Sequence, residues 1–463
     1  MNIIYKKSPH FFQNVIISIF NIYNYILRYG KYYKLKRLIF QKNRNLHLNQ
    51  LLEIQQTKFK NFINFTNENS KYYKKVWKNI DNIDNINCLN TLPIITKEKL
   101  RSNINDVYTV SSTKSILSKT GGTTGKSLEV RYTRKDMQER FAMLDAFRNN
   151  YGYKLGKKTA WFSGKNILTI KDLYRNRFWK TDWFYKVRYY STFHISSKSI
   201  NYYINDLIFF RPEYIVGFPS NLYEIAKYGL NKGITFPSCI KAIFPTAETV
   251  TSESRKTIEK FFKTKIYNQY ASSEGAPFIF ECESGSLHLE LQSGVFEVLD
   301  NNNQPAMQGR LVVTSFTTHG TPLVRYDIGD EISLSSLICD CGNNNPIVSE
   351  IFGRTDDYVY SKEFGKINLG NISNTLKGVQ GIKTFQVIQN SLDTILILIV
   401  KDLDNFRSID QQRFINNWKD RLGDKVKIEI NFVKHISVEK SGKFRLVKEN
   451  LLKNCVIYNT LYL

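Results

Sequence analysis

The sequence predicts an α/β protein with a largely parallel sheet, followed by an appended β region and a small α+β domain. Between residues 135 and 270, short apolar runs typical of buried strands alternate with stretches of helical period. After about residue 285, shorter strands and turns replace this alternation. The last hundred residues form a β-β-α-β pattern of their own, which is the size of a small separate domain.

Composition limits the classes of partner. The 463 residues suffice for more than one domain, and 42% hydrophobic residues supply a sizeable core. The formal net charge of +25 favours anionic partners such as nucleotides or phospholipid headgroups, although a base-composition bias of the genome explains it equally well. No basic block is interleaved with aromatic residues closely enough to indicate nucleic acid binding. Six cysteines in so long a chain do not form a disulfide framework, so a reducing, cytoplasmic compartment is expected.

Residues 1–85 are expected to form a helical N-terminal region without the cleavage site of a signal peptide. Within the apolar run Phe11–Leu27, Asn14, Ser18 and Asn21 fall three or four residues apart and mark one face of a helix. The run is too short and too polar to span a bilayer comfortably. Two interpretations stay open: a helix packed on its own domain, which is favoured, and a helix on an anionic membrane surface, which the following basic residues support.

The alternating elements follow in order along the middle of the chain. Strands are expected at 239–244 and 265–270, a strand and then a turn within 159–164, and a strand and then a loop within 214–220. The expected helices are 135–151, 203–210, 221–228 and 252–262. In the last unit, strands are expected at 384–389, 394–400 and 425–433, with a helix at 410–422 that Gly423 closes. The candidate boundary before this unit is Gly353–Asp357.

A loop rich in glycine and threonine, Thr120–Ser127, has the composition to wrap an anion. Glycine lets backbone N–H groups approach phosphate oxygens, and the hydroxyl groups add donors. The loop does not match the Walker A pattern, which requires glycine where Thr120 stands and a helix directly afterwards. Leu128–Thr133 instead alternates like a strand. We therefore expect a phosphate cradle between two strands, with a plain hairpin turn as the alternative.

Four further stretches contain residue types that suit a nucleotide site. In 268–275, a tyrosine that can stack on a purine and a carboxylate that can hold magnesium follow a strand. In 321–330, Asp330 can accept hydrogen bonds from both ribose hydroxyls. The others are the charged turn at 353–357 and a glycine-borne lysine in 440–445. Each is ordinary by itself, and it is their order that is informative.

In order, these stretches resemble the core motifs of the adenylate-forming (acyl-AMP) ligase superfamily. The sequence has "KTGGTTGKS", "YASSE", "RYDIGD", "GRTDD" and "SGKFR" where the superfamily has "SSGTTGKP", "YGxTE", "RYxTGD", "GRxDD" and a late "GK" lysine. "GFPSNLYEIA" (217–226) and "TAET" (246–249) resemble the phenylacetate–CoA ligase branch. "KSPHFFQNVIISIF" (7–20) is similar to its CapK-like members, which are associated with capsule and surface-polysaccharide synthesis.

The resemblance implies a fold and a domain division. A large multi-layer adenylation domain with mixed sheets would comprise the helical region 1–85 and a core, 86–355, that includes the appended β region. A mobile C-terminal lid domain would comprise 356–463. Asp356 would be the hinge about which the lid rotates between two half-reactions.

The resemblance also implies roles for individual residues in the reaction of a carboxylate with MgATP, which gives acyl-AMP and pyrophosphate. Lys443 would bridge the attacking carboxylate and the α-phosphate, Glu274 would help to bind Mg²⁺, and Thr123 would act with them in catalysis. The residues implied in nucleotide binding are Thr120, Gly121, Gly122, Thr123, Thr124, Gly125, Lys126, Ala247, Glu248, Tyr270, Ser273, Asp330, Arg354 and Asp356. Ala271 and Ile328 depart from the family pattern, which usually has glycine and threonine there.

Cys282, His288, Cys339 and Cys341 form two close pairs in the sequence. Three thiolates and an imidazole are a ligand set for structural zinc, but their spacing alone leaves zinc and free thiols equally open. Resemblance to the phenylacetate–CoA ligase branch, whose members can hold zinc at matching positions, favours a structural Zn²⁺ that braces the β region.

The sequence thus predicts an AMP-forming acid ligase that uses ATP and Mg²⁺ and passes the acyl group to CoA or to a sugar-linked acceptor. Its setting would be the biosynthesis of surface polysaccharide such as capsule or O-antigen. The alternative is a catalytically inactive, nucleotide- or membrane-binding member of the same fold. A basic zinc protein that binds nucleic acid does not explain the five ordered motifs. Peripheral membrane association and a homodimer stay open.

Overall fold

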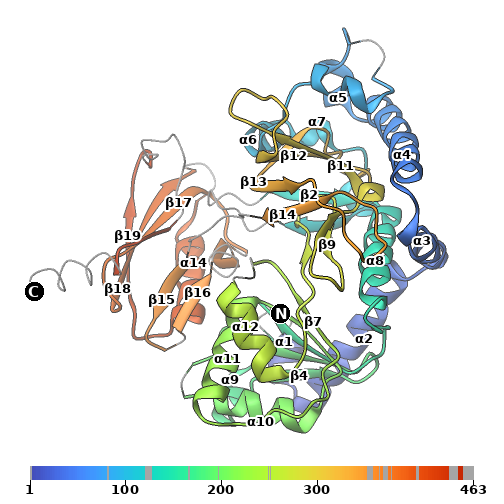
Figure 1. Ribbon diagram of the computed structural model, residues 1–463. Helices are drawn as coiled ribbons and strands as arrows, with labels where there is room; N and C mark the ends of the chain where they lie inside the picture. The colour runs from blue at the N-terminus through green and yellow to red at the C-terminus, as the bar shows by residue number, and fades with distance from the viewer. Residues whose placement is uncertain are drawn as a thin grey trace, which may run out of the picture.

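The computed structural model describes residues 3–80, 83–119, 128–164, 167–196, 198–248, 250, 252–351, 358–363, 365–368, 374–376, 378–402, 406–436 and 447–451. Figure 1 shows a large body, formed by the chain as far as β14 (Ile347–Ile351), and a smaller body coloured orange to red. No helix within these ranges has both the length and the apolar character needed to cross a membrane.

A five-stranded sheet forms one half of the large body. Its strand order is β4-β5-β3-β6-β7, and all neighbours are parallel except the antiparallel pair β4 and β5. Every residue of β6 and β7 is buried, as expected for strands covered on both faces. The strands are β3 (Thr159–Ser163), β4 (Trp179–Asp182), β5 (Val187–Ser191), β6 (Tyr214–Gly217) and β7 (Ala242–Pro245).

Helices cover both faces of this sheet. On one face, Ile215 and Ile243 pack with apolar residues of three helices: α10 (Ile200–Phe210), α11 (Pro219–Asn231) and α12 (Ser252–Phe262). On the other face, Tyr214 and Phe244 pack with Phe147 of α8 (Arg134–Asn149) and with residues of α3 (Lys31–Lys42). Alternate residues along β6 and β7 therefore belong to two separate cores, which is the period-2 pattern of a strand.

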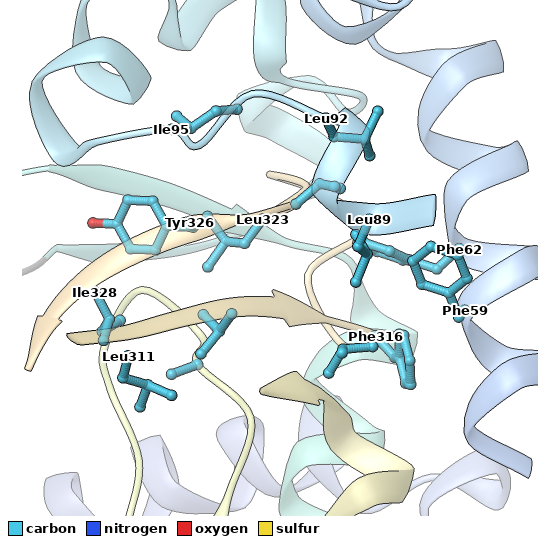
Figure 2. Close-up of a cluster of buried hydrophobic side chains, with 14 of the residues drawn as sticks. Phe59, Phe62, Leu89, Leu92, Ile95, Leu311, Phe316, Leu323, Tyr326 and Ile328 are labelled. Carbon is cyan, nitrogen blue, oxygen red and sulfur yellow. The ribbon is translucent and has the colours of Figure 1, made fainter. Parts of the chain in front are cut away.

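A seven-stranded sheet forms the other half of the large body, and all of its neighbouring strands are antiparallel. In Figure 2, Phe59 and Phe62 of α4 (Leu48–Asn69) point toward Phe316, which lies in the core beneath this sheet. The strands, in spatial order, are β11 (Gly294–Leu299), β12 (Gln308–Ser315), β13 (Tyr326–Ser335), β14, β10 (Leu287–Leu289), β9 (Ile279–Glu281) and β8 (Gln269–Tyr270).

The N-terminal helices wrap the two sheets. Glu139 of α8 joins two of them, because its carboxylate accepts from Lys36 Nζ of α3 at 3.2 Å and from Lys58 Nζ of α4 at 2.9 Å. The remaining helices are α1 (Ile3–Lys7), α2 (His10–Arg28), α5 (Lys71–Val76), α6 (Lys97–Ser102), α7 (Ile104–Val107) and α9 (Ile170–Tyr174). Short 3₁₀ turns occur at Asn43–Asn45, Ile86–Thr91, Ser112–Lys114, Leu291–Ser293 and Asn374–Leu376.

The smaller body contains a four-stranded sheet of order β19-β18-β17-β20. The central pair β17 (Ile382–Gln389) and β18 (Thr394–Lys401) is antiparallel, and the flanking β19 (Lys427–Phe432) and β20 (Val447–Glu449) are each parallel to their neighbour. Trp418 of α14 (Ser408–Leu422) is fully buried against this sheet. A two-stranded pair, β15 (Tyr358–Ser361) and β16 (Gly365–Asn368), belongs to the same body.

The predicted fold class is confirmed: the chain is a mixed α/β protein with several sheets and a C-terminal α+β domain. Two details differ. The strand expected at 265–270 is regular only at Gln269–Tyr270, with a single bridge between Ile243 and Ile266 before it. The hairpin of β4 and β5 was not predicted, because its polar residues do not form an apolar run.

Candidate functional site

The predicted phosphate loop lies between two paired strands. β1 (Ile116–Lys119) and β2 (Glu129–Tyr132) are antiparallel, and Lys119 is the register partner of Glu129 across the loop. Thr120–Ser127 themselves lie outside the described residues, as do the predicted site residues Arg354, Asp356 and Lys443. A strand on each side of the loop, with no helix directly after it, is the arrangement expected from the sequence.

The strand after the phosphate loop reaches the tyrosine–glutamate stretch directly. Tyr132 Oη at the end of β2 donates to the Ser273 backbone carbonyl at 2.9 Å. Gly275 has φ +105°, and a Cβ there would lie 2.5 Å from Thr318 Cγ2 and 2.8 Å from Tyr132 Oη. Only glycine fits this conformation and this close approach. β2, the strand that follows the phosphate loop, and the tyrosine–glutamate stretch, about 140 residues apart in sequence, are therefore in contact.

Glu274, the predicted magnesium ligand, lies beside a cation. Its Oε1 is 2.8 Å from Lys97 Nζ, and the two side chains are only 10% and 12% exposed. Lys97 is the first residue of α6, which is capped by Thr96, whose hydroxyl accepts from the Lys99 backbone N–H. The sequence gave no sign that Lys97 would meet Glu274. Because this ion pair is largely shielded from water, the local dielectric constant is low and the attraction between the two charges is strong.

The predicted adenine and ribose residues also meet. Tyr270 Oη in β8 donates to Asp330 Oδ2 in β13 at 2.6 Å, which joins two motifs 60 residues apart. Arg325, from the same motif as Asp330, serves a different purpose. Its guanidinium pairs with Glu297 at 2.8 Å and donates to the Leu92 carbonyl, so it fixes β13 against the segment before α6.

Glu248 and Ala247, also predicted to bind nucleotide, follow β7 at the carboxyl edge of the parallel sheet. Ala247 has φ +63°, a left-handed conformation that is uncommon outside glycine. The Glu248 carboxylate accepts from Ser220 N–H at 2.9 Å and from Ser220 Oγ at 3.0 Å, at the first turn of α11. It thereby links the ends of β6 and β7, the edge at which ligands bind in open α/β sheets.

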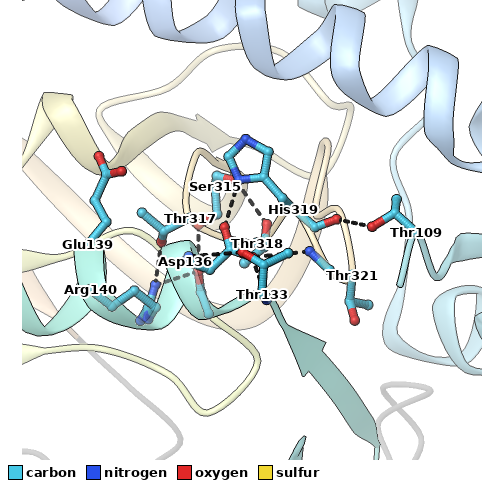
Figure 3. Close-up of polar contacts among 12 residues, drawn as sticks. Thr109, Thr133, Asp136, Glu139, Arg140, Ser315, Thr317, Thr318, His319 and Thr321 are labelled. Atoms are coloured by element: carbon cyan, nitrogen blue, oxygen red, sulfur yellow. Dashed lines mark hydrogen bonds and ion pairs between the residues drawn. The ribbon is translucent and has the colours of Figure 1, made fainter. Parts of the chain in front are cut away.

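A buried polar network supports these loops from beneath, and the sequence analysis missed it. Figure 3 shows Asp136 of α8 between Thr133 and His319. Its carboxylate is 2.6 Å from His319 Nδ1 and accepts from the Thr133 backbone N–H at 2.9 Å. Arg140, one turn later, donates to the Gly275 carbonyl at 3.0 Å and to Thr317 Oγ1 at 2.9 Å. The Thr133-x-x-Asp136 spacing is a capping box, so this part was readable from the sequence.

The four predicted metal ligands come together. The ligand atoms of Cys282, His288, Cys339 and Cys341 all lie within 4.8 Å of one another. Cys282 Sγ and Cys339 Sγ are 3.6 Å apart, and Cys341 Sγ is 3.5 Å from His288 Nε2. Tetrahedral zinc with its usual bond lengths would separate these atoms by about 3.6–3.8 Å.

The surroundings of the cluster also fit a metal. His288 Nδ1 lies 2.9 Å from the Asn345 carbonyl, an arrangement that fixes the proton on Nδ1 and leaves Nε2 to face the three thiols. The backbone N–H of Asn343 donates to Cys341 Sγ at 3.4 Å, as is usual for a thiolate ligand. His288 is buried in β10, and β10 pairs with β14 beyond the cysteine loop, so the cluster fastens that loop to the sheet.

Comparisons with known proteins agree with this architecture. A family model described as "CapK C-terminal domain" matches residues 359–450. The chain is 33% identical to Protein CapK of Staphylococcus aureus over 460 residues, which cover 97% of this chain and 100% of that protein. It is 32% identical to phenylacetate-coenzyme A ligase of Thermus thermophilus over 158 residues, or 32% of this chain and 35% of that enzyme.

Solved structures of acyl-CoA ligases share the fold. A crystal structure of 2-hydroxyisobutyryl-CoA ligase in the postadenylation state, in complex with R3-HIB-AMP, matches with a TM-score of 0.59 at 15% identity. The match covers 91% of this chain and 94% of that one. The same enzyme in complex with 2-HIB-AMP and CoA, in the thioesterification state, gives a TM-score of 0.58 at 16% identity with the same coverage. The TM-scores and the coverage of these matches show that the chain shares this fold across both bodies.

Proposed function

The chain belongs to the CapK family, and from this premise we propose that it is an ATP-dependent, AMP-forming carboxylic acid ligase in the phenylacetate–CoA ligase branch of the adenylate-forming ligases. It would convert an acid to acyl-AMP and then pass the acyl group to CoA or another acceptor. The chain is similar to Protein CapK over 97% of its length. Its structural neighbours are acyl-CoA ligases described with acyl-AMP and CoA.

The observation that carries the proposal is the convergence of two distant motifs with the strand that follows the phosphate loop. Tyr270 Oη is 2.6 Å from Asp330, and the backbone carbonyl of Ser273, next to Glu274, is 2.9 Å from Tyr132 at the end of the strand that leaves the phosphate loop. A purine face, a ribose acceptor and a carboxylate thus lie beside the strand that follows a loop whose composition suits phosphates. A single bound ATP would need all four.

The chemistry expected of these residues is mainly positioning and charge neutralisation, because both reactants are anions. Residues 120–126 would hold the β- and γ-phosphates, Tyr270 would stack on adenine, and Asp330 with Arg354 would hold the ribose. Lys443 would place its ammonium between the attacking carboxylate and the α-phosphate. Thr123 would add a hydroxyl donor to the departing pyrophosphate.

Glu274 is the residue that would hold Mg²⁺, because carboxylate oxygens are the ligands this ion prefers. When bound, the ion would neutralise phosphate charge. Lys97 lies 2.8 Å from Glu274 and pairs with this nearly buried carboxylate. Lys97 would therefore have to share Glu274 with the ion, or release it when MgATP binds.

We also propose that Cys282, His288, Cys339 and Cys341 hold a structural Zn²⁺. The spacing of the ligand atoms and the Asn345 contact to His288 support this. Four protein ligands leave no open position for a water molecule, so the metal would brace the β region between the Tyr270–Glu274 and Arg325–Asp330 stretches and would not take part in the reaction.

The setting we propose is surface-polysaccharide biosynthesis, with a sugar-linked hydroxyl or amine as an acceptor besides CoA. What supports it is membership of the CapK family. The acceptor can be identified by supplying CoA, amino sugars and nucleotide sugars in turn to protein loaded with acyl-AMP, and by following AMP release by chromatography.

The deciding experiment is carboxylate-dependent release of pyrophosphate with a broad panel of acids. We expect at least one acid to stimulate release, and Lys443→Ala to lower the rate on the order of 10²–10³-fold, because a charge acting only in the transition state is lost. Lys434→Ala is a matched control, since Lys434 is an exposed lysine of the same domain. If folded, zinc-loaded protein shows no stimulation with any acid, the inactive alternative, a member that only binds nucleotide, replaces the ligase.

A further inference from the structure

Helix α2 is packed inside out. Its polar side chains Gln13, Asn14 and Ser18 are buried, with 2%, 3% and 9% exposed, whereas its apolar side chains face outward. In an ordinary surface helix of a globular protein the apolar stripe faces the core and the polar residues face water. The Asn14–Ser18–Asn21 stripe predicted from the sequence is therefore real, but it forms the inner face.

The inner face of α2 covers the edge of the sheet and accepts hydrogen bonds there, as a neighbouring strand would. β4 is the edge of the five-stranded sheet, and its outward backbone N–H groups need acceptors. Asn14 Oδ1 accepts from Thr181 N–H at 3.1 Å, and Ser18 Oγ accepts from Trp183 N–H at 3.1 Å. Residues four apart on the helix thus accept from two N–H groups, one within β4 and one directly after it. Figure 1 shows α2 beside this sheet.

A buried ion pair fixes the orientation of the helix. Lys180 of β4 has 0% of its side chain exposed and lies 2.7 Å from Asp172. Its ammonium also contacts His10 Nδ1 at 3.0 Å and the Gln13 side-chain oxygen. If α2 rolled over to bury its apolar face, Lys180 and the N–H groups of β4 would lose these partners. The exposure of that face is therefore built into the fold.

The outward face is large and continuous. Phe11 contacts Trp183 of the β4–β5 turn, with ring centroids 4.9 Å apart, so Trp183 and the neighbouring Phe184 extend this face. The six outward apolar side chains of α2 are each between 57% and 62% exposed: Phe11, Phe12, Ile19, Phe20, Tyr23 and Ile26. Contiguous exposed apolar surface of this kind marks a protein or membrane interaction site.

The positive charge around this face favours an anionic partner over a second copy of the chain. The first 52 residues of the sequence contain nine lysines and arginines and no aspartate or glutamate. Lys6 and Lys7 before the helix and Lys31 and Lys34 after it are exposed, so cations border the apolar face at both ends. Two copies of such a surface would repel each other, whereas anionic lipid headgroups would be attracted. Aromatic residues beside apolar ones are also typical of the membrane–water interface.

We propose that the outward face of α2, with Trp183 and Phe184, docks the protein in the plane of an anionic lipid bilayer. The apolar side chains would enter the boundary between headgroups and acyl chains, and the flanking lysines would contact the headgroups. The helix would lie on the surface and would not cross it. The inference does not depend on the proposed ligase activity.

The test is co-sedimentation of the full chain with vesicles of phosphatidylcholine alone or of phosphatidylcholine mixed with phosphatidylglycerol. We expect binding to the anionic vesicles, weaker binding at high salt, and a loss on the order of tenfold or more in the triple variant Phe12→Ser/Phe20→Ser/Tyr23→Ser. The matched control is Phe209→Ser/Met307→Ser/Ile409→Ser, which removes three apolar side chains elsewhere that are each at least 57% exposed and is expected to bind as the wild type does.

Circular dichroism and sedimentation velocity on the same samples complete the test. All three proteins should have the same helical content, because the substituted side chains point away from the fold. Equal vesicle binding by the wild type and the α2 variant would overturn the proposal. So would a wild-type dimer that does not bind vesicles and that the α2 variant dissociates, since the face would then serve a second copy of the chain.

Discussion

Glu139 shows how one buried carboxylate can hold several elements. Burial alone would raise its pKa, but the ammonium groups of Lys58 and Lys36 and the hydroxyl of Tyr32 hold the pKa at about 2, below the ordinary 4.5. The carboxylate therefore stabilises the folded protein fully above pH 4.5, and the contribution is lost as the pH falls toward 2. Below both values, folding gains nothing from the charge.

From this follows a pH-dependent effect of Glu139→Gln. At neutral pH we expect a loss of about 3 kcal/mol, because two partly buried ammonium groups lose their counterion. The loss should shrink as the pH falls below about 4.5, where the wild-type carboxylate also becomes protonated. Thermal midpoints at a series of pH values measure this, with the exposed Glu331→Gln as the control. A deficit that stays constant down to the lowest pH would contradict the role of charge.

At the residue level, sequence reasoning found motifs but not their partners. The stretches containing Tyr270, Glu274 and Asp330 were recognised from their order, and Tyr270 and Asp330 do meet. Lys97 was overlooked because nothing local marks a lysine that pairs with a carboxylate 177 residues away. Such pairs depend on how loops from separate sheets converge, which residue types and spacing do not encode.

Among the elements, α2 depends on Lys180 for its position. Burial lowers the pKa of this ammonium, and its hydrogen bond to Asp172 opposes that shift. We expect Lys180→Met to destabilise the protein by about 3–5 kcal/mol, since Asp172 would remain buried without its cation. Amide exchange in residues 10–28 should accelerate more than in β6. Lys171→Met, at an exposed lysine of α9, is the control.

A double variant separates the ion pair from general damage. Lys180→Met/Asp172→Asn removes both charges, so it should be more stable than Lys180→Met alone. If the two variants were equally unstable and exchange were uniform over the molecule, the position of α2 would not depend on this pair.

Removing one ligand of the cysteine cluster should release the proposed zinc ion and destabilise the loop that the cluster holds. Cys341→Ser should reduce bound zinc from about one per chain to far less, and should lower the thermal midpoint, because the loop 339–343 loses its attachment to β10. Zinc is measured by atomic emission on protein purified without chelator. Cys88→Ser, at a thiol outside the cluster, should keep the metal and the midpoint. Zinc-free wild-type protein would refute the site.

Periodicity located most elements to within a few residues, for example α12 at Ser252–Phe262 and β18 at Thr394–Lys401. Periodicity failed to predict elements whose buried residues are polar. β4 has the sequence Trp-Lys-Thr-Asp, and three of its four residues are buried, which no hydropathy pattern anticipates. The orientation of α2 could not be predicted for the same reason. The sequence showed the polar stripe of the helix, but it did not show the polar strand edge to which that stripe bonds.

At the scale of the whole molecule, the chain comprises a large body with two large sheets and the β1–β2 pair, and a C-terminal body whose core is closed around Trp418. The family model for the C-terminal domain begins at residue 359, shortly after the Gly353–Asp357 stretch. Two separate cores joined by a short segment allow one body to rotate without disturbing the packing of the other. Rotation of the C-terminal body about Asp356 would thus allow one site to carry out two half-reactions in turn.

Asp356→Pro tests this rotation. Proline fixes φ near −65° and restricts the residue before it, so the two bodies should be held in a narrow range of orientations. In single-turnover assays, we expect pyrophosphate release and acyl transfer from supplied acyl-AMP to change unequally, one staying within a few-fold while the other falls on the order of tenfold or more. Asp356→Ala removes the carboxylate but leaves the backbone free, so both steps should persist. Equal loss of both steps in Asp356→Pro, or no loss of either, would mean that the bodies do not exchange places about this residue.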